Sequence, residues 1–420
     1  MDHFSFINGA LHAEGVPLAT IAAEVGTPVY VYSRATLERH ARVFQESLSG
    51  LERTHFAFAI KANPNLSVLS VLAKCGFGAD VVSGGEVSRA ISAGMKPGDI
   101  VFSGVGKTRG ELQAALDKGV GQFNIELEEE GIVLSALAVA MGRKAVAVLR
   151  VNPDVDAGTH AKISTGMKEN KFGVPIDQAS AIYTRLSALP GLDMRGVALH
   201  IGSQIFDLGP LEAAYAKLGG FAMDLRAQGL TVDRIDLGGG LGVPYKRDEV
   251  PPPPAEYGRM VERVSKGWDV TLMFEPGRVI VGNAGVLLTE VIWVKPGVTH
   301  PWVIVDAAMN DLARPAMYDA WHDFEAVVPT GERTVANIAG PVCESGDTFA
   351  KARDIDVVRS GDLAVFRTAG AYGATMASTY NSRALVPEVM VDGDKWAIVA
   401  HRVEPETLIA AEPLPDWLLG

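Results

Sequence analysis

The sequence predicts an α/β protein with two domains, a (β/α)8 barrel over residues 30–275 and a mostly β domain. Three observations support this prediction. Short apolar segments with strand spacing alternate eight times with segments of helical spacing. Several helical segments end at glycine, the usual C-terminal stop of a helix. Beyond Gly277 the long helical segments cease, and a chain of 420 residues is too long for one ordinary domain.

The barrel is preceded by a short lead-in, in which we expect a helix over Pro17–Val25 and then a strand, VYVYS. Eight strands and their intervening helices follow, the arrangement that closes into a barrel. The expected strands are Phe56–Ile60, Ala79–Val82, Ile100–Phe102, Gln122–Ile125, Ala145–Val151, Gly196–Ile201, Arg234–Leu237 and Thr271–Phe274. The expected helices include 65–76, 84–94, 108–119, 128–142, 177–191 and 211–229.

The second domain is expected to comprise residues 276–420 together with residues 1–29, because both segments flank the barrel in the chain. Its strand-like runs are VIVGNAGVLLTEVIWVK, PWVIVDA, DLAVFRTAGAY and KWAIVAHR. The four prolines at Pro251–Pro254 predict a stiff loop that acts as a spacer.

Composition excludes several classes of function. The net charge of −12 argues against a nucleic-acid partner. Two cysteines are too few for a disulfide framework, which fits a cytoplasmic location. The N-terminus lacks a signal-peptide pattern, and we expect no membrane span and no metal site.

A single lysine is the first candidate for catalysis. Lys61 lies at the end of an apolar strand in HFAFAIKANPN, and Pro64 then breaks the strand. We expect this lysine to lose hydration, which favours a free amine able to form a Schiff base with pyridoxal phosphate. A lysine that extends from a strand end to solvent is the competing interpretation.

Polar residues follow most of the predicted strands, at the end of the barrel where active sites lie. The glycine-rich loop Gly238–Gly242 follows the seventh strand, where backbone N–H groups commonly bind a phosphate. His200, after the sixth strand, offers a flat ring that can stack on a cofactor. Glu275, after the eighth, offers a carboxylate for the pyridine nitrogen, with an ion pair to Arg278 as the alternative.

FAIKANPN, HIGSQ, GGGLG, EPGR, GPVCESGD and GAYGATMASTYN occur in this order and spacing over essentially the whole chain. In these motifs the chain resembles the diaminopimelate decarboxylases, which are fold-type III pyridoxal phosphate enzymes with an alanine-racemase-like barrel. Residues 150–173 are also similar to this family. The resemblance implies decarboxylation of meso-2,6-diaminopimelate to L-lysine and CO2, the last step of lysine biosynthesis.

The resemblance also implies roles for individual residues. Lys61, His200 and Cys343 would be catalytic. The cofactor would be bound by Lys61, Asp80, His200, Ser203, Gly239, Gly240, Glu275, Gly277, Arg278 and Tyr372. The substrate would be bound by Arg278, Arg314, Tyr318, Glu344 and Tyr372. In this family the Cys-Glu segment reaches in from the partner subunit, which implies a homodimer with shared active sites.

The residues themselves support a substrate with an amino acid group at each end. Arginine binds carboxylates through two parallel hydrogen bonds. Arg314 and Tyr318 are one helical turn apart, although Pro315 also permits a turn there. Two departures from the family affect the rim of the site: Leu127 replaces the usual serine, and FSGVGKT is a loose version of its counterpart.

Three alternatives remain open. A decarboxylase for ornithine, arginine or carboxynorspermidine has the same fold, but the ornithine and arginine enzymes resemble each other in having Cys-Asp where this chain has Cys343-Glu344. An amino acid racemase of this fold has an arginine in place of Glu275. A non-catalytic pyridoxal phosphate protein resembles a bare barrel without the long second domain.

Overall fold

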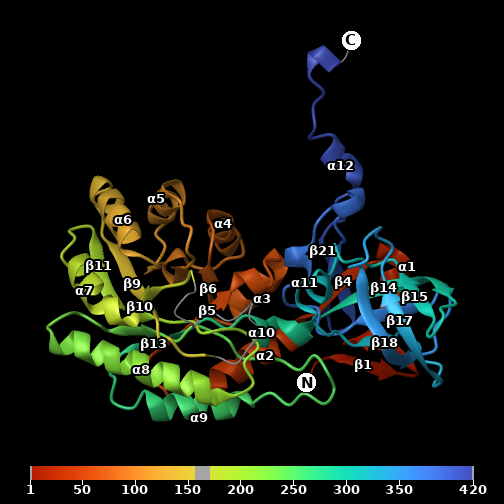
Figure 1. The fold of residues 1–420 in the computed structure, drawn as a ribbon, viewed down its shortest axis with the longest axis horizontal. Coiled ribbons are helices and arrows are strands. Elements are labelled where there is room, and N and C mark those ends of the chain that lie inside the picture. The colour runs from red at the N-terminus through yellow and green to blue at the C-terminus, as the bar shows by residue number, and fades with distance from the viewer. Residues whose placement is uncertain (1, 157–170, 419–420) are drawn as a thin grey trace. The chain divides into compact units, whose positions relative to one another are not determined.

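The computed structural model describes residues 2–156 and 171–418 of the chain, which form two compact units. The barrel unit comprises Leu37–Pro244 and Asp248–Val281. The mostly β unit comprises the residues up to Thr36, the short stretch Tyr245–Arg247, and the residues from Gly282 onward. Figure 1 shows the elements of both units along the chain.

The barrel is closed by eight parallel strands, as the sequence predicted. Each strand pairs with the next, and the last pairs with the first through Leu272–Thr54, Met273–His55 and Phe274–Phe56. The strands are β5 (Thr54–Ala59), β6 (Gly78–Val81), β7 (Ile100–Phe102), β8 (Gln122–Ile125), β9 (Ala145–Asn152), β11 (Leu192–Ala198), β12 (Arg234–Asp236) and β13 (Thr271–Phe274). A short strand, β10 (Val174–Pro175), pairs with the end of β9.

The connecting helices also follow the predicted pattern, and the structure adds others. The helices are α2 (Arg34–Ser47), α3 (Leu66–Lys74), α4 (Gly84–Ser92), α5 (Arg109–Lys118), α6 (Glu128–Ala140), α7 (Ile176–Ser187), α8 (Leu208–Ala227), α9 (Pro254–Val264) and α10 (Arg278–Val281). The sequence analysis missed α2 and α9, and the proline run is no mere spacer because α9 begins at Pro254. Proline is favourable in the first turn of a helix. Figure 1 shows α9 beside α8.

Aromatic packing covers the seam where the barrel closes. Phe44 on α2 and Tyr257 on α9 contact Phe274 on β13, with ring centroids 6.3 and 6.4 Å apart, and Phe44 also packs edge-on against Phe56 on β5. Because α2 and α9 bury their apolar faces on β5 and β13, they fix the two strands whose ends carry Lys61 and Glu275.

The mostly β unit has its own sheet and core. Its sheet has the order β18 (Thr348–Asp356), β17 (Arg333–Ala339), β15 (Trp302–Val305), β14 (Gly285–Lys295), β4 (Val29–Ser33), β20 (Glu388–Asp392) and β21 (Lys395–Ala400). β19 (Leu363–Phe366) pairs with β14 and with β16 (Phe324–Ala326). The other elements of this unit are β1 (Phe4–Ile7), β2 (Ala10–Ala13), β3 (Val16–Pro17), α1 (Leu18–Val25), α11 (Arg314–Tyr318) and α12 (Pro405–Ile409).

The N-terminal residues belong to this second core. Leu11, Leu18 and Ile21 are buried in one cluster with Leu288 on β14 and Val389 on β20. One prediction was wrong in part: residues 279–284, VIVGNA, are not strand, because Arg278–Val281 is helical and β14 begins only at Gly285. Among the described residues, no helix is both long and apolar enough to span a membrane.

Side-chain caps mark the start of four barrel helices, whereas α6, α7 and α9 lack one. Asn65, Ser83, Thr108 and Asp207 each accept a backbone hydrogen bond at the start of α3, α4, α5 and α8. The same position of α6 holds Leu127, which has extended backbone angles but no acceptor atom.

The substitution Leu127→Ser is therefore expected to stabilise the protein. A serine there can accept a hydrogen bond from the first turn of α6, which is worth about 1 kcal/mol in free energy of unfolding. Urea unfolding of the variant measures the gain, and Leu127→Ala serves as the control because it removes the leucine without adding an acceptor. Equal stability of the serine and alanine variants would contradict the cap argument.

Candidate active site

The ends of the barrel strands meet around a cavity of about 400 Å3. Lys61 follows β5 in a short 3-10 turn, Ile60–Ala62, and Glu275 directly follows β13. Gly277 lets the chain after β13 pass close to this turn, since a Cβ on it would lie 3.1 Å from the Cβ of Ala59. The residues lining the cavity are Lys61, Val82, Ser103, Gly104, Val105, Gly106, Asn124, Arg150, Phe172, Ala198, Leu199, His200 and Glu275.

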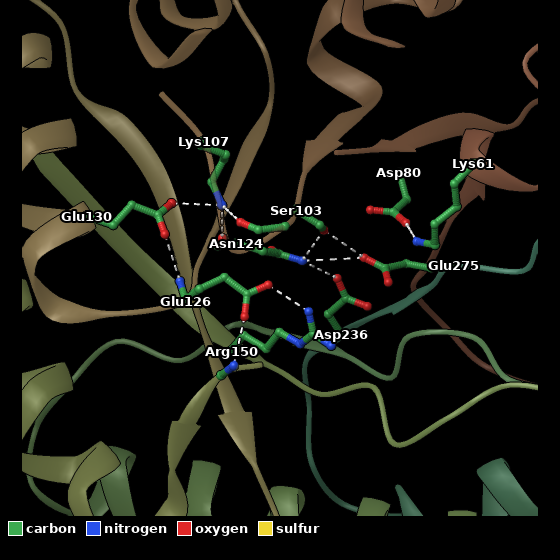
Figure 2. A network of polar contacts seen from close by, with 12 residues as sticks. Lys61, Asp80, Ser103, Lys107, Asn124, Glu126, Glu130, Arg150, Asp236 and Glu275 are labelled. Carbon is green, nitrogen blue, oxygen red and sulfur yellow. Dashed lines mark hydrogen bonds and ion pairs between the residues drawn. The ribbon is translucent and has the colours of Figure 1, made fainter. Parts of the chain in front are cut away.

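Lys61 is held by an ion pair with Asp80 on β6. The Nζ atom lies 2.6 Å from Oδ2 of Asp80, whose side chain is completely buried (Figure 2). The expected loss of hydration at Lys61 is not observed, because 39% of its side chain is exposed. The buried carboxylate orients the amine. Lys61 is therefore positioned at the cavity by its ion pair with Asp80, and its side chain remains in contact with solvent.

Three carboxyl groups lie at this end of the barrel: Asp80 on β6 and Asp236 at the end of β12 are buried, and Glu275 is partly buried. Burial raises the pKa of Glu275 well above its usual value, and the neighbouring charges of Asp236 and Asp80 raise it further, while Lys61 lowers it. Burial also raises the pKa of Asp236, which shares a hydrogen bond with Glu275. Glu275 therefore has a raised affinity for a proton.

An amide from β8 connects these groups (Figure 2). Asn124 Nδ2 donates to Asp236 Oδ2 at 3.2 Å and to Glu275 Oε1 at 3.4 Å. Its own oxygen accepts from Gln122, which fixes the direction of the amide. Oδ1 of Asp80 is buried and has no hydrogen-bond partner among the described residues. The wall is thus rich in acceptors and suits a ligand that presents a positively charged N–H group.

The glycine-rich loop after β12 passes close to two other strand ends. A Cβ on Gly239 would lie 2.3 Å from the carbonyl oxygen of Glu275. A Cβ on Gly240, whose φ is +124°, would lie 2.8 Å from that of Gly202. Next to this loop, Arg278 is buried and donates to Ser203 Oγ at 3.2 Å. Backbone N–H groups, a hydroxyl and a guanidinium are suitable donors for a phosphate.

His200 is neutral in this site. Burial lowers its pKa to about 3, and the positive charges of Arg150 and Lys61 contribute to this shift. Its Nδ1 accepts from the backbone N–H of Gly239 at 3.3 Å. The imidazole therefore offers an uncharged flat ring at the cavity, consistent with stacking against another flat ring.

The remaining predicted site residues belong to the mostly β unit. Arg314 donates to Nε2 of His322 at 2.8 Å, and its guanidinium lies 4.3 Å from the centre of the Tyr245 ring. Arg314 and Tyr318 are the first and last residues of α11, so they share a helical turn. Cys343, Glu344 and Tyr372 complete the predicted set.

Cys343 and Glu344 occupy a loop that a buried aspartate supports. Both are exposed, and Oε1 of Glu344 accepts from the backbone of Gly346 at 3.4 Å. Asp347 accepts from the backbone N–H groups of Met309 and Val342 at 2.7 and 2.8 Å. Tyr372 has a φ of +55°, a conformation uncommon outside glycine. This strain is typical of functional positions.

Sequence reasoning missed three residues of the cavity region: Ser103, Arg150 and Asp236. Asp236 had a usable signal, since it is the charged residue of RIDLGGG at the end of a buried strand. Arg150 is likewise a charged residue inside a mostly apolar strand. Ser103 offered no signal beyond its place after a strand.

Comparison with known proteins identifies the family of this chain. The family described as pyridoxal-dependent decarboxylase, pyridoxal binding domain, matches residues 34–282. Diaminopimelate decarboxylase from Zymomonas mobilis is 51% identical over 418 residues, covering 99% of each chain. The enzyme of the same name from Pseudomonas aeruginosa is 49% identical and also covers 99% of each chain.

Solved structures of diaminopimelate decarboxylases share this fold. Diaminopimelate decarboxylase from M. jannaschii superposes with a TM-score of 0.95 and 34% identity, over 99% of each chain. The enzyme from Helicobacter pylori, complexed with L-lysine, has a TM-score of 0.90 and 38% identity, over 94% of this chain and 98% of that one. This chain therefore belongs to the diaminopimelate decarboxylases, within the pyridoxal-dependent decarboxylase family.

Proposed function

We propose that this protein removes CO2 from meso-2,6-diaminopimelate to give L-lysine, with pyridoxal phosphate as cofactor, as the last step of lysine biosynthesis. The observation that carries the proposal is the cavity in which Lys61 and Glu275 face each other from opposite sides of the barrel seam. The end-to-end similarity to diaminopimelate decarboxylases supports the substrate.

The residues of the cavity fit pyridoxal phosphate. Oδ1 of Asp80, which has no hydrogen-bond partner in the described part of the chain, and Glu275, whose pKa is raised, suit a ring nitrogen that shares a proton. The close backbone approaches at Gly239 and Gly240 leave no space for side chains, so that the backbone of this loop could approach a phosphate closely. Lys61 would hold the cofactor covalently, His200 would lie against its ring, and Ser203, Gly277, Arg278 and Tyr372 would complete the binding set.

The chemistry that pyridoxal phosphate supplies when bound is an electron sink for the pair left on the α-carbon as CO2 departs. Glu275 would strengthen this sink by sharing a proton with the ring nitrogen, and Asn124, which bonds to both Glu275 and Asp236, holds the Glu275 carboxyl group in place. Asp80 orients the amine of Lys61. Lys61 and Cys343 are the candidates to deliver a proton to the α-carbon.

The distal end of the substrate carries a carboxylate and an ammonium group, and the predicted residues have the matching charges. Arg278, Arg314 and Tyr318 would bind the carboxylate, with Tyr372 beside them, and Glu344 would bind the ammonium. Support for these roles comes from the resemblance to the family and from the ability of arginine to bind a carboxylate through two hydrogen bonds.

A substrate comparison tests the proposed function. Purified protein with pyridoxal phosphate should release CO2 and L-lysine in equal amounts from meso-diaminopimelate. Ornithine and arginine, assayed in parallel, should react at least about 100-fold less efficiently, since neither has a distal carboxylate and the cations that bind it would remain unpaired. Comparable turnover of ornithine would identify the enzyme as a decarboxylase of a different substrate class.

We also propose a homodimer in which Cys343 and Glu344 complete the active site of the partner subunit. The support is the resemblance to the family and the exposure of this loop, which a second chain can reach. A cytoplasmic location is part of the same proposal, supported by the two cysteines, Cys75 and Cys343, neither of which forms a disulfide.

Complementation tests the shared site. Lys61→Ala and Glu344→Ala should each be nearly inactive as homodimers, because loss of Glu344 leaves the distal ammonium unpaired in a partly desolvated pocket. A mixed dimer contains one site with both residues intact, so dissociation and reassociation of the two variants should restore part of the activity. If confirmed mixed dimers stay inactive, each site is built within a single chain.

A further inference from the structure

A network of charged side chains adjoins the cavity, and the roles proposed above do not include it. It joins Arg150, Glu126, Glu130 and Lys107, as Figure 2 shows. Buried ion pairs are poor contributors to stability, because the loss of hydration offsets much of their attraction. A network of this kind next to a ligand site therefore calls for a role other than stability.

Arg150 carries the charge of this network to the cavity. It lies on β9 and lines the cavity together with Phe172 and His200. Its guanidinium lies 4.9 Å from the centre of the Phe172 ring, and its Nη1 is 2.6 Å from Oε1 of Glu126. One contact restrains the face of the guanidinium and the other its edge, so the group is fixed in direction.

Glu126 connects the other residues of the network, and both of its carboxylate oxygens accept hydrogen bonds. Oε1 accepts from Arg150, and Oε2 accepts from the backbone N–H of Gly173 at 2.8 Å. Gly173 directly follows Phe172, so the same carboxylate places the arginine and the ring that packs on it. A glutamine in this position has only one acceptor oxygen and would leave either Arg150 or Gly173 without its partner.

Glu130 and Lys107 support Glu126 on the side away from the cavity. Oε2 of Glu130 accepts from the backbone N–H of Glu126 at 3.1 Å. The side chain of Lys107 is completely buried, and its Nζ lies 2.8 Å from Oε1 of Glu130. It also donates to the carbonyls of Gly104 and Asn124, at 2.6 and 2.9 Å. The segment FSGVGKT thereby fixes two parts of the cavity wall, Gly104 and the end of β8.

We propose that Glu126 is a positioning residue, which aims the charge of Arg150 at a negatively charged oxygen of the bound cofactor. The proposal rests on the proposed function for the identity of that ligand. The contribution of Arg150 to the lowered pKa of His200 agrees with it, because the arginine charge must lie close to the imidazole. Glu130 supports Glu126 through the backbone N–H of Glu126, and Lys107 in turn pairs with Glu130.

A double-mutant cycle on cofactor affinity tests the proposal. Pyridoxal phosphate is titrated into cofactor-free Glu126→Gln, Arg150→Gln, the double variant and the unaltered protein. Glu126→Gln should bind the cofactor about 10- to 100-fold more weakly, the value of one hydrogen bond to a charged group. The double variant should bind no more weakly than Arg150→Gln, since Glu126 acts through Arg150.

The matched control is Glu128→Gln, two residues away, which alters an exposed pair with Arg185 and should bind like the unaltered protein. If Glu126→Gln binds normally, or if the two losses add in full, Glu126 has only a structural role and the proposal is wrong. If Glu126→Gln does not fold, Glu130→Gln takes its place in the cycle, with the same two outcomes.

A crystal structure of cofactor-free Glu126→Gln separates this proposal from the proposed function. The guanidinium of Arg150 should leave its place over Phe172, or Gly173 should lose its acceptor and shift. An unchanged Arg150 and Gly173 would overturn the positioning role even if the cofactor were a different molecule. Failure of the unaltered protein to bind pyridoxal phosphate would instead overturn the proposed function. The positions of Arg150 and Gly173 in Glu126→Gln would still decide whether Glu126 is a positioning residue.

Discussion

Lys61→Ala is expected to lower kcat by about 1,000-fold or more and to remove the yellow colour of the protein with its cofactor. The reason is that this amine, held by Asp80 at 2.6 Å, is the group proposed to hold the cofactor covalently. Absorbance spectra and CO2 release measure the two effects.

The control for this change is Lys118→Ala, at an exposed lysine on α5, which should leave both colour and turnover unchanged. A Lys61→Ala protein that keeps full activity would remove Lys61 from the mechanism. Added methylamine offers a second check, since a small free amine can replace part of the missing side chain only where the cavity remains intact.

Glu275→Gln is expected to lower kcat by about 100-fold or more while substrate affinity changes little. Glutamine keeps the shape of the side chain, but it cannot share a proton with the ring nitrogen. The electron sink matters only as CO2 leaves, so the loss falls on the transition state rather than on binding. Steady-state kinetics and a separate binding titration distinguish the two.

Glu212→Gln is the matched control, since Glu212 is an exposed carboxylate paired with Arg263 on the outside of the barrel. If Glu275→Gln lowers substrate affinity while kcat holds, Glu275 binds substrate and the assignment to the cofactor nitrogen is wrong.

Periodicity predicted the barrel well because each strand is a short apolar run between turn residues. Position along the barrel then predicted that Lys61 and Glu275 lie near one cavity, although 214 positions separate them (275 minus 61). The hydration of Lys61 was not predictable in the same way. It depends on the exposed fraction of one side chain and on Asp80, which belongs to a different strand.

The errors arise where tertiary packing overrides local preference. The β-branched run Val279–Val281 favours a strand, yet it is helical, with Ile280 and Val281 buried. The charged network was also hidden, because Lys107 and Glu130 become neighbours only when the loop after β7 meets α6. Sequence spacing alone gives no sign of that contact.

The most direct test of the account is to identify the lysine that holds the cofactor. The protein is loaded with pyridoxal phosphate, reduced with borohydride to make the attachment permanent, digested, and mapped by mass spectrometry. The account predicts that the added mass lies on Lys61 and is absent from the Lys61→Ala variant. Modification of another lysine near the cavity, such as Lys107, with Lys61 unmodified, would contradict it.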